Sequence, residues 1–163
     1  MIDIRLVEEP EQKIEICTSI LRALPSWFGI ETSIADYAAS TRSMPTWVAF
    51  DDEKPIGFVV LKKHNAYSVE ISVMGVLNEY HRIGVGRELY ERCEEYCVEQ
   101  NVEFITVKTL DETIRSLPYA KTRRFYLAMG FRPLEVFPSH WNKDNPCLFM
   151  AKNLAQSKLL AGE

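Results

Sequence analysis

A short stretch with two glycines, HRIGVG at His81–Gly86, lies between a strand-like segment and a helix-like segment. Glycine at such a junction lets backbone N–H groups approach an anion closely. The helix that follows adds unpaired N–H groups and the positive end of its dipole. The side chains of His81, Arg82 and Arg87 add polar or cationic donors. This pattern is typical of a pyrophosphate-binding loop, although a strand-to-helix turn that binds nothing is compatible with the same glycines.

The spacing of the glycines excludes two common phosphate-binding motifs. A P-loop requires Lys and then Ser or Thr after its second glycine, whereas Arg87 and Glu88 follow Gly86. The dinucleotide fingerprint G-x-G-x-x-G requires a third glycine at the position that Leu89 occupies. Antiparallel strands are also expected before the loop, so a nucleotide-binding oxidoreductase of the Rossmann type is disfavoured.

The elements that must position the loop follow from hydrophobic periodicity and turn residues. We expect strands at 2–7, 46–50, 56–62, 66–76, 104–109, 132–137 and 146–153, and helices at 11–24, 32–40, 84–101 and 119–129. Gly130 is expected to cap the last helix, and Ala155–Glu163 to fray. Antiparallel hairpins followed by a β-α-β crossover predict an α/β fold whose mixed sheet carries helices on both faces. At 163 residues the chain is expected to form a single domain, 1–163.

Composition and charge narrow the classes of partner. A net charge of -4 argues against a broad basic surface for nucleic acid. No segment reaches the roughly 20 apolar residues of a membrane helix, and the first residues lack a targeting pattern. We therefore expect a cytoplasmic protein with neither nucleic acid nor a membrane as its partner.

The cysteines and histidines do not have the spacing of a zinc site. Cys93 and Cys97 form the one close cysteine pair, and they share a helical stripe with Val85 and Leu89. This stripe favours core packing over metal binding. No metal is therefore expected.

Two motifs resemble those of the GNAT family of acetyl-CoA-dependent N-acetyltransferases. The family's phosphate loop, Q/R-x-x-G-x-G/A, is matched by His81–Gly86, with His81 in place of Gln or Arg. The second motif, a helix ending in F-Y-x-x-x-G-F, is matched by Phe125, Tyr126, Gly130 and Phe131. The resemblance spans residues 46–153, and residues 138–150 are similar to a bacterial subgroup of small members. It implies the GNAT acyl-CoA N-acyltransferase fold, with a central mixed, mostly antiparallel sheet.

The resemblance also implies acetyl-CoA as a co-substrate. Its pyrophosphate would contact Arg82, Ile83, Gly84, Val85, Gly86 and Arg87, while the contribution of His81 is left open by the departure from the pattern. The backbone at the end of the preceding strand, at Met74, Gly75 and Val76, would pair with the pantetheine arm like an added strand. The alternatives are a solvated side chain for Arg87 and a bulge for Gly75.

Two side chains are candidates for the acid–base chemistry of acetyl transfer. The motif match places the hydroxyl of Tyr126 near the cofactor sulfur, where a phenol can protonate a thiolate. The alternative is that Tyr126 only packs on the pantetheine arm or in the core. Glu70 stands where many family members carry a strand glutamate near the acceptor pocket, and it would be the general base, directly or through water. The alternative is a solvated glutamate on a strand.

The resulting prediction is an N-acetyltransferase that moves an acetyl group to a primary amine of a small molecule or peptide, by direct attack in a ternary complex. The alternative is a non-catalytic acyl-CoA-binding or sensing module. Trp27, Phe28 and Tyr37 either wall an acceptor pocket or pack in the core. Many such domains dimerise through sheet edges or their last strands, so the resemblance is compatible with a homodimer.

Overall fold

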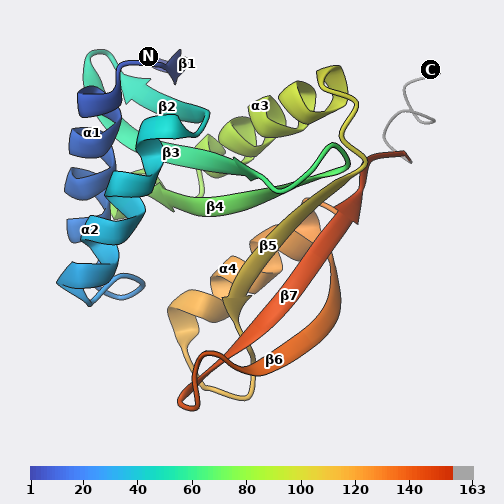
Figure 1. The fold of residues 1–163 in the computed structure, drawn as a ribbon. Helices are drawn as coiled ribbons and strands as arrows, with labels where there is room; N and C mark the ends of the chain where they lie inside the picture. The colour runs from blue at the N-terminus through green and yellow to red at the C-terminus, as the bar shows by residue number, and fades with distance from the viewer. Residues whose placement is uncertain (156–163) are drawn as a thin grey trace. The chain divides into compact units, whose positions relative to one another are not determined.

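The computed structural model describes residues 1–155 (Figure 1). Its elements, in chain order, are β1 (Ile2–Val7), α1 (Pro10–Arg22), α2 (Glu31–Ser40), η1 (Thr41–Ser43), β2 (Thr46–Asp51), β3 (Lys54–Lys63), β4 (Ser68–Val76), η2 (Asn78–Tyr80), α3 (Val85–Glu99), β5 (Phe104–Leu110), α4 (Leu117–Ala128), β6 (Arg132–Asn142) and β7 (Asn145–Asn153). The strands follow the order β1-β2-β3-β4-β5-β7-β6. The predicted order of helices and strands and the predicted mixed sheet are confirmed. Apart from Ala155, the end expected to fray lies outside the described residues.

The chain divides into two compact units. The first contains 1–63 and 72–96, and the second contains 64–71 and the described residues from 97 onward. The strand β4 and the helix α3 each contribute residues to both units. That the whole chain acts as one domain stays a prediction.

In the first unit, helices cover both faces of the sheet. Val48, Phe50, Phe58 and Val60 alternate along β2 and β3 and pack against apolar residues of α1 and α2, which lie side by side in Figure 1. On the opposite face, the Trp47 ring makes an edge contact with Tyr96 of α3, with ring centroids 5.1 Å apart. The prediction that helices lie on both faces of the sheet is therefore confirmed here.

The helix α1 shows how local sequence fixes an element of this core. The side chain of Glu9 accepts hydrogen bonds from the backbone N–H groups of Glu11 and Gln12, and Pro10 occupies the first turn. Ile20 and Leu21 on its inner stripe are 2% and 0% exposed. Burial of each such side chain stabilises the fold by about 1.5–3 kcal/mol.

In the second unit, β5 pairs in parallel with Ser68–Ile71 of β4 and antiparallel with β7, which in turn pairs with β6. The hydroxyl of Ser116 caps α4 by accepting from the backbone N–H of Tyr119 at 3.4 Å, and Gly130 follows the helix with a φ of 102°. This positive φ agrees with its predicted role as a C-terminal cap. Most of β6 is exposed, and it runs on to Asn142 rather than ending at Phe137 as predicted.

Candidate active site

The glycine loop turns the chain from η2 into α3 with two residues in left-handed conformations. Gly84 has a φ of 89°, and Arg82 has a φ of 67° although it carries a side chain. A Cβ at Gly84 would meet no atom within 4 Å, so glycine is needed here for its conformation and not for space.

The first turn of α3 has N–H groups without an acceptor inside the helix, and they lie beside this loop. The backbone N–H of Glu88 donates to the carbonyl of Gly84 at 3.0 Å. The N–H groups of Val85, Gly86 and Arg87 come before this bond, so no carbonyl one turn earlier in the helix can accept from them. Val85 is 2% exposed and fixes the helix in the core, while the side chains of Arg82 and Arg87 are exposed. Backbone donors at a helix N-terminus beside two cationic side chains fit a phosphate anion.

His81 is bound within the loop. Its Nε2 lies 2.6 Å from the carbonyl oxygen of Val76, and its ring makes an edge contact with Trp27 at 5.7 Å between centroids. A carbonyl oxygen only accepts hydrogen bonds, so Nε2 carries the proton. His81 therefore ties the end of β4 to the start of the glycine loop.

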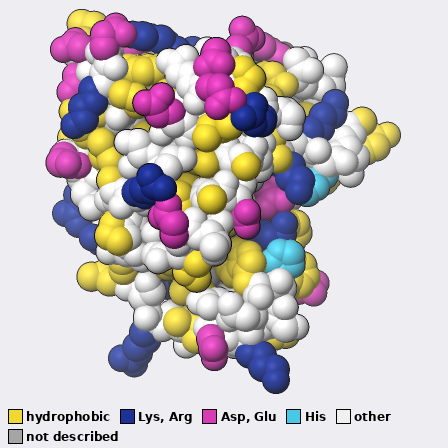
Figure 2. All heavy atoms as spheres, turned by 60° about the vertical axis from the view of Figure 1, so that its left-hand side comes forward, with side chains coloured by type: hydrophobic (Ala, Val, Ile, Leu, Met, Phe, Trp, Pro, Cys, Tyr) yellow, Lys and Arg dark blue, Asp and Glu magenta, His cyan; other side chains and the backbone are white. Residues whose placement is uncertain are grey.

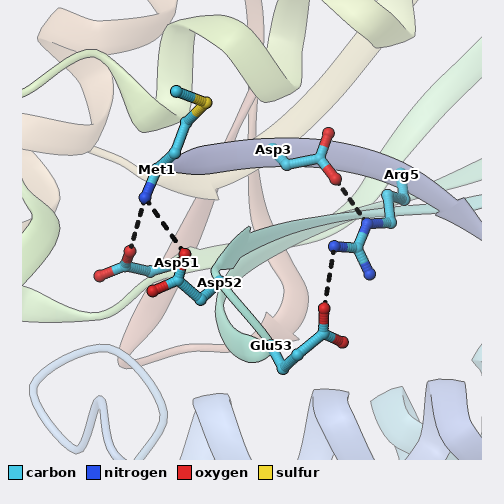
Figure 3. Close-up of polar contacts among 6 residues, drawn as sticks. All are labelled: Met1, Asp3, Arg5, Asp51, Asp52 and Glu53. Carbon is cyan, nitrogen blue, oxygen red and sulfur yellow. Dashed lines mark hydrogen bonds and ion pairs between the residues drawn. The ribbon is translucent and has the colours of Figure 1, made fainter.

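A second contact anchors the residue just before the loop. The hydroxyl of Tyr80 donates to Oδ2 of Asp51 at 2.6 Å, and this hydrogen bond lowers the pKa of Asp51 and raises the pKa of Tyr80. The ammonium group of Met1 lies 3.5 Å from Oδ1 of Asp51 and 3.4 Å from Oδ1 of Asp52 (Figure 3). The loop is thus connected to the turn between β2 and β3.

The strand residues predicted to meet the pantetheine arm lie at the end of β4. Met74 and Val76 are partly exposed, whereas Gly75 is buried. A Cβ at Gly75 would stand 3.1 Å from Cδ1 of Leu24 and 3.5 Å from both Ile20 and Phe58. The missing side chain of Gly75 therefore admits the core side of α1, and its backbone role toward a cofactor stays a prediction.

Glu70 belongs to a charged cluster of the second unit. Its Oε1 lies 2.6 Å from Nε2 of His64, and Nζ of Lys108 lies 3.1 Å from each of its two oxygens. The exposed fractions of the Glu70, Lys108 and His64 side chains are 11%, 23% and 37%. The alternative of a solvated strand glutamate is therefore wrong, because Glu70 is largely buried and fully partnered.

The register of the strands produces this cluster. Glu70 lies opposite Thr106 in the parallel ladder of β4 and β5, so Lys108 is its diagonal neighbour on the same face. His64 reaches Glu70 from the turn before β4, where its backbone N–H donates to the carbonyl of Ser68 at 3.0 Å. Sequence reasoning missed both His64 and Lys108. Periodicity alone gives no register between strands, and nothing marked these two residues in the sequence.

Tyr126 lies in the last turns of α4 within the second unit. It is 6% exposed, and its ring makes edge contacts with Phe125 and Phe131, both at 5.4 Å between centroids. The backbone N–H of Phe131 donates to its carbonyl at 3.0 Å. The residues of the F-Y-x-x-x-G-F motif therefore form one aromatic cluster that orients the phenol.

The remaining candidates are explained by packing. Trp27, Phe28 and Tyr37 are partly buried and pack against the core of the first unit, which supports their reading as core residues. All four cysteines are buried, and burial raises the pKa of Cys17 to about 12. Cys93 and Cys97 are both 0% exposed, which confirms their predicted packing role.

Two properties of the described residues concern membranes and metal ions. Within residues 1–155, no helix is both long and apolar enough to cross a membrane. Over the same residues, no group of three or more His, Cys, Asp or Glu side chains is arranged to hold a metal ion. On the face drawn in Figure 2, basic and acidic side chains are interspersed.

The sequence of the chain also identifies its family. Residues 14–131 match the sequence model of the acetyltransferase (GNAT) family. No curated protein matches the chain. Because the family match covers well over half of the sequence, the chain belongs to the GNAT family and is an acyltransferase by family.

Solved structures with the same fold include several acetyltransferases. A GNAT-family protein from Desulfovibrio desulfuricans is 15% identical with a TM-score of 0.79, and the alignment covers 94% of this chain and 99% of that one. The ribosomal-protein-S18-alanine N-acetyltransferase of Escherichia coli is 15% identical with a TM-score of 0.73, over 94% of each chain. An aminoglycoside 6'-N-acetyltransferase complexed with coenzyme A is 18% identical with a TM-score of 0.74, over 94% and 97% of the two chains. These similarities show the GNAT fold.

Proposed function

We propose that this protein transfers the acetyl group of acetyl-CoA to a primary amine of a small molecule or peptide, by direct attack in a ternary complex. The observation that carries the proposal is the glycine loop at the start of α3. There, Gly84 is left-handed, and the N–H groups of Val85–Arg87 have no acceptor within the helix, so this junction can form an anion cradle. Membership of the GNAT family and a neighbour solved with coenzyme A support acetyl-CoA as the donor.

Each part of the loop has a role in this proposal. The N–H groups of residues 85–87 and the side chains of Arg82 and Arg87 bind the pyrophosphate, while Ile83 contributes its backbone. His81 holds the loop in place through Val76. The backbone of Met74, Gly75 and Val76 pairs with the pantetheine arm. Bound acetyl-CoA supplies an acyl group that is activated as a thioester.

Protons must leave the acceptor for the transfer to occur. A primary ammonium group has a pKa near 10.4 by the lysine value, so most acceptor molecules arrive charged at neutral pH. The nitrogen loses one proton before it attacks, and a second as the new C–N bond replaces the C–S bond. One of these protons ends on the thiol and the other in solvent. We assign the supply of the thiol proton to Tyr126, and the first deprotonation to Glu70 or a group that it controls.

The cysteines support direct attack rather than an acetylated enzyme. A thiolate is the nucleophilic form of cysteine. Burial raises the pKa of Cys17 to about 12 and also raises the pKa of Cys147. The four buried thiols therefore offer no ready nucleophile.

The first experiment is calorimetric titration of the protein with acetyl-CoA, with coenzyme A and NAD as parallel ligands. Micromolar binding of acetyl-CoA without binding of NAD is expected. Release of free thiol from acetyl-CoA in the presence of a panel of primary amines then tests catalysis. Binding without thiol release would favour a sensing module, and no binding of either coenzyme A species would overturn the proposal.

A further inference from the structure

Glu70 is poorly placed to accept a substrate proton itself. Lys108 bridges its two carboxylate oxygens at 3.1 Å, and His64 occupies Oε1 at 2.6 Å. A base must have an accessible lone pair for the proton it takes. With a side chain that is only 11% exposed, Glu70 uses most of its acceptor sites for contacts within the protein.

His64 has the properties that Glu70 lacks. A glutamate side chain is ordinarily ionised at neutral pH and then only accepts hydrogen bonds, so Nε2 of His64 is the donor in this pair. In the neutral ring Nδ1 is then the acceptor. The His64 side chain is also the member of the cluster most open to solvent, at 37%. A carboxylate that fixes the orientation and tautomer of a histidine is a known way to prepare a general base.

We infer that His64 takes the first proton from the acceptor amine, with Glu70 as its positioning residue and Lys108 as the counter-ion of Glu70. This inference rests on the proposed acetyl transfer. One proton moves from the acceptor ammonium to Nδ1, and the nitrogen keeps the electron pair with which it attacks. The Nε2 proton stays in its hydrogen bond to Glu70. The imidazolium then releases the Nδ1 proton to water.

The charged and titratable groups around the pair of His64 and Glu70 come from three strands. Glu70 of β4 contacts it directly, and Lys108 of β5 contacts Glu70. Cys147 of β7 is electrostatically coupled to both Glu70 and Lys108, and burial raises its pKa, so it stays a neutral thiol at pH 7. Glu70 and Lys108 therefore place one negative and one positive charge beside the His64 ring.

The first test needs no substrate. NMR of the free protein should show a resolved, slowly exchanging Nε2–H proton for His64, identified by its loss in His64→Gln. In Glu70→Ala this proton should exchange with water and its signal should disappear. If Glu70→Ala does not fold, Glu70→Ala combined with Lys108→Met removes the unpaired lysine as well. An Nε2–H signal that survives the loss of Glu70 would overturn the positioning role.

The second test separates a base from a structural link. His64→Gln keeps an N–H donor for Glu70 but cannot take a proton. We expect its kcat at neutral pH to fall by about a hundredfold to ten-thousandfold, with the KM for acetyl-CoA unchanged. The deficit should shrink as the pH rises toward the pKa of the amine, because the acceptor then arrives uncharged. His140→Gln, at an exposed histidine of β6, is the matched control and should keep the wild-type rate.

The outcomes distinguish this inference from the function on which it rests. A wild-type enzyme that releases thiol, together with a fully active His64→Gln, would overturn the inference and leave acetyl transfer standing. A pH-independent loss in His64→Gln would also overturn it, because a structural defect does not depend on the charge of the acceptor. A wild-type protein inactive on every amine would remove the function and the proton transfer together.

Discussion

Nε2 of His81 lies 2.6 Å from the carbonyl oxygen of Val76, so one side chain joins the end of β4 to the start of the glycine loop. The GNAT pattern has Gln or Arg at this position, and both of these side chains also carry N–H donors. His81 therefore differs from the pattern in residue type but keeps the N–H donor that Gln and Arg would provide. Its structural role here is to hold the loop against the end of β4.

His81→Ala should weaken acetyl-CoA binding because it frees the carbonyl of Val76 and loosens the loop. The loss of one hydrogen bond is worth about 0.5–1.5 kcal/mol, which corresponds to a two- to tenfold weaker Kd. His81→Gln retains a donor and should recover part of the affinity. Calorimetric titration measures all three proteins, with the exposed His140→Ala as the control. Equal affinities for the Ala and Gln variants would contradict this role.

Gly84→Ala should destabilise the protein by about 1–2 kcal/mol, because a φ of 89° is costly for a residue with a side chain. Arg82→Gly is the reverse change, because it places glycine where a residue with a side chain now has a positive φ. It relieves the strain of a positive φ, so stability should change by less than about 1 kcal/mol while acetyl-CoA binds more weakly. Urea unfolding and calorimetry report the two quantities. Gly29→Ala is the control, since its Cβ would meet only the carbonyl of Pro25 at 3.5 Å. A Gly84→Ala protein as stable as the wild type would rule out this account of the loop.

Tyr126→Phe should lower kcat by about a hundredfold or more while the KM for acetyl-CoA stays nearly constant. The substitution removes the proton donor and keeps the ring that packs against Phe125 and Phe131. Thiol release under saturating substrates measures kcat. Tyr67→Phe makes the same chemical change at a tyrosine that is 61% exposed and should keep full activity. An unchanged kcat in Tyr126→Phe would leave Tyr126 with a packing role alone.

The pair of Glu70 and Lys108 should show a strong energetic coupling. A double-mutant cycle with Glu70→Gln and Lys108→Met is expected to give about 1–3 kcal/mol, because neither side chain is well solvated. The pair of Arg22 and Glu31 is the matched comparison, with side chains 59% and 62% exposed, and should give about 0–1 kcal/mol. Urea unfolding supplies the free energies. Similar coupling energies for both pairs would mean that burial does not strengthen the interaction between Glu70 and Lys108.

The contact between Tyr80 and Asp51 should appear in the acid dependence of stability. The hydrogen bond from Tyr80, followed by that from the terminal ammonium, lowers the pKa of Asp51. A lowered carboxyl pKa adds stability above the unfolded value near 3.9 that is lost as the pH falls through the folded value. Tyr80→Phe should therefore lose less stability on acidification than the wild type.

Urea unfolding between pH 7 and about pH 2.5 measures this difference. The gap between wild type and Tyr80→Phe should stay constant down to about pH 4 and then narrow. Tyr67→Phe, at a tyrosine that is 61% exposed, should follow the wild type throughout. A gap that is the same at every pH would show that the charge of Asp51 is not involved.

Much of the fold could be predicted from the sequence because its elements have strong local signals. The order of strands and helices and the extent of β1 are as expected. The largest difference is β6, which was expected to end before Pro138 but continues to Asn142. Proline interrupts an interior strand but is accepted at the edge of a sheet, and the position of β6 at the edge is a tertiary property. The start of α4 was missed by two residues, because Ser116 was not recognised as its cap.

Part of the candidate site could likewise be predicted from the sequence, and part could not. The loop at His81–Gly86 is contiguous, so its pattern is visible in the sequence, and the structure adds the internal hydrogen bond of His81. Lys108 stands 38 residues from Glu70. Their contact depends on the register of β5 against β4, which no periodicity encodes. His64 was missed for a different reason: it lies outside the strands, and its contact with Glu70 depends on the conformation of the turn before β4.

The exposed strand β6 has a consequence for how the protein behaves in concentrated solution. An unpaired strand edge is a template on which another chain can add by hydrogen bonding. Here the register against β7 shifts between Pro133 and Glu135 and again between Phe137 and Asn142, and two prolines lack N–H groups. The outer edge therefore offers no long regular row of donors and acceptors. We expect the folded protein to resist strand-by-strand aggregation despite the apolar side chains that β6 exposes.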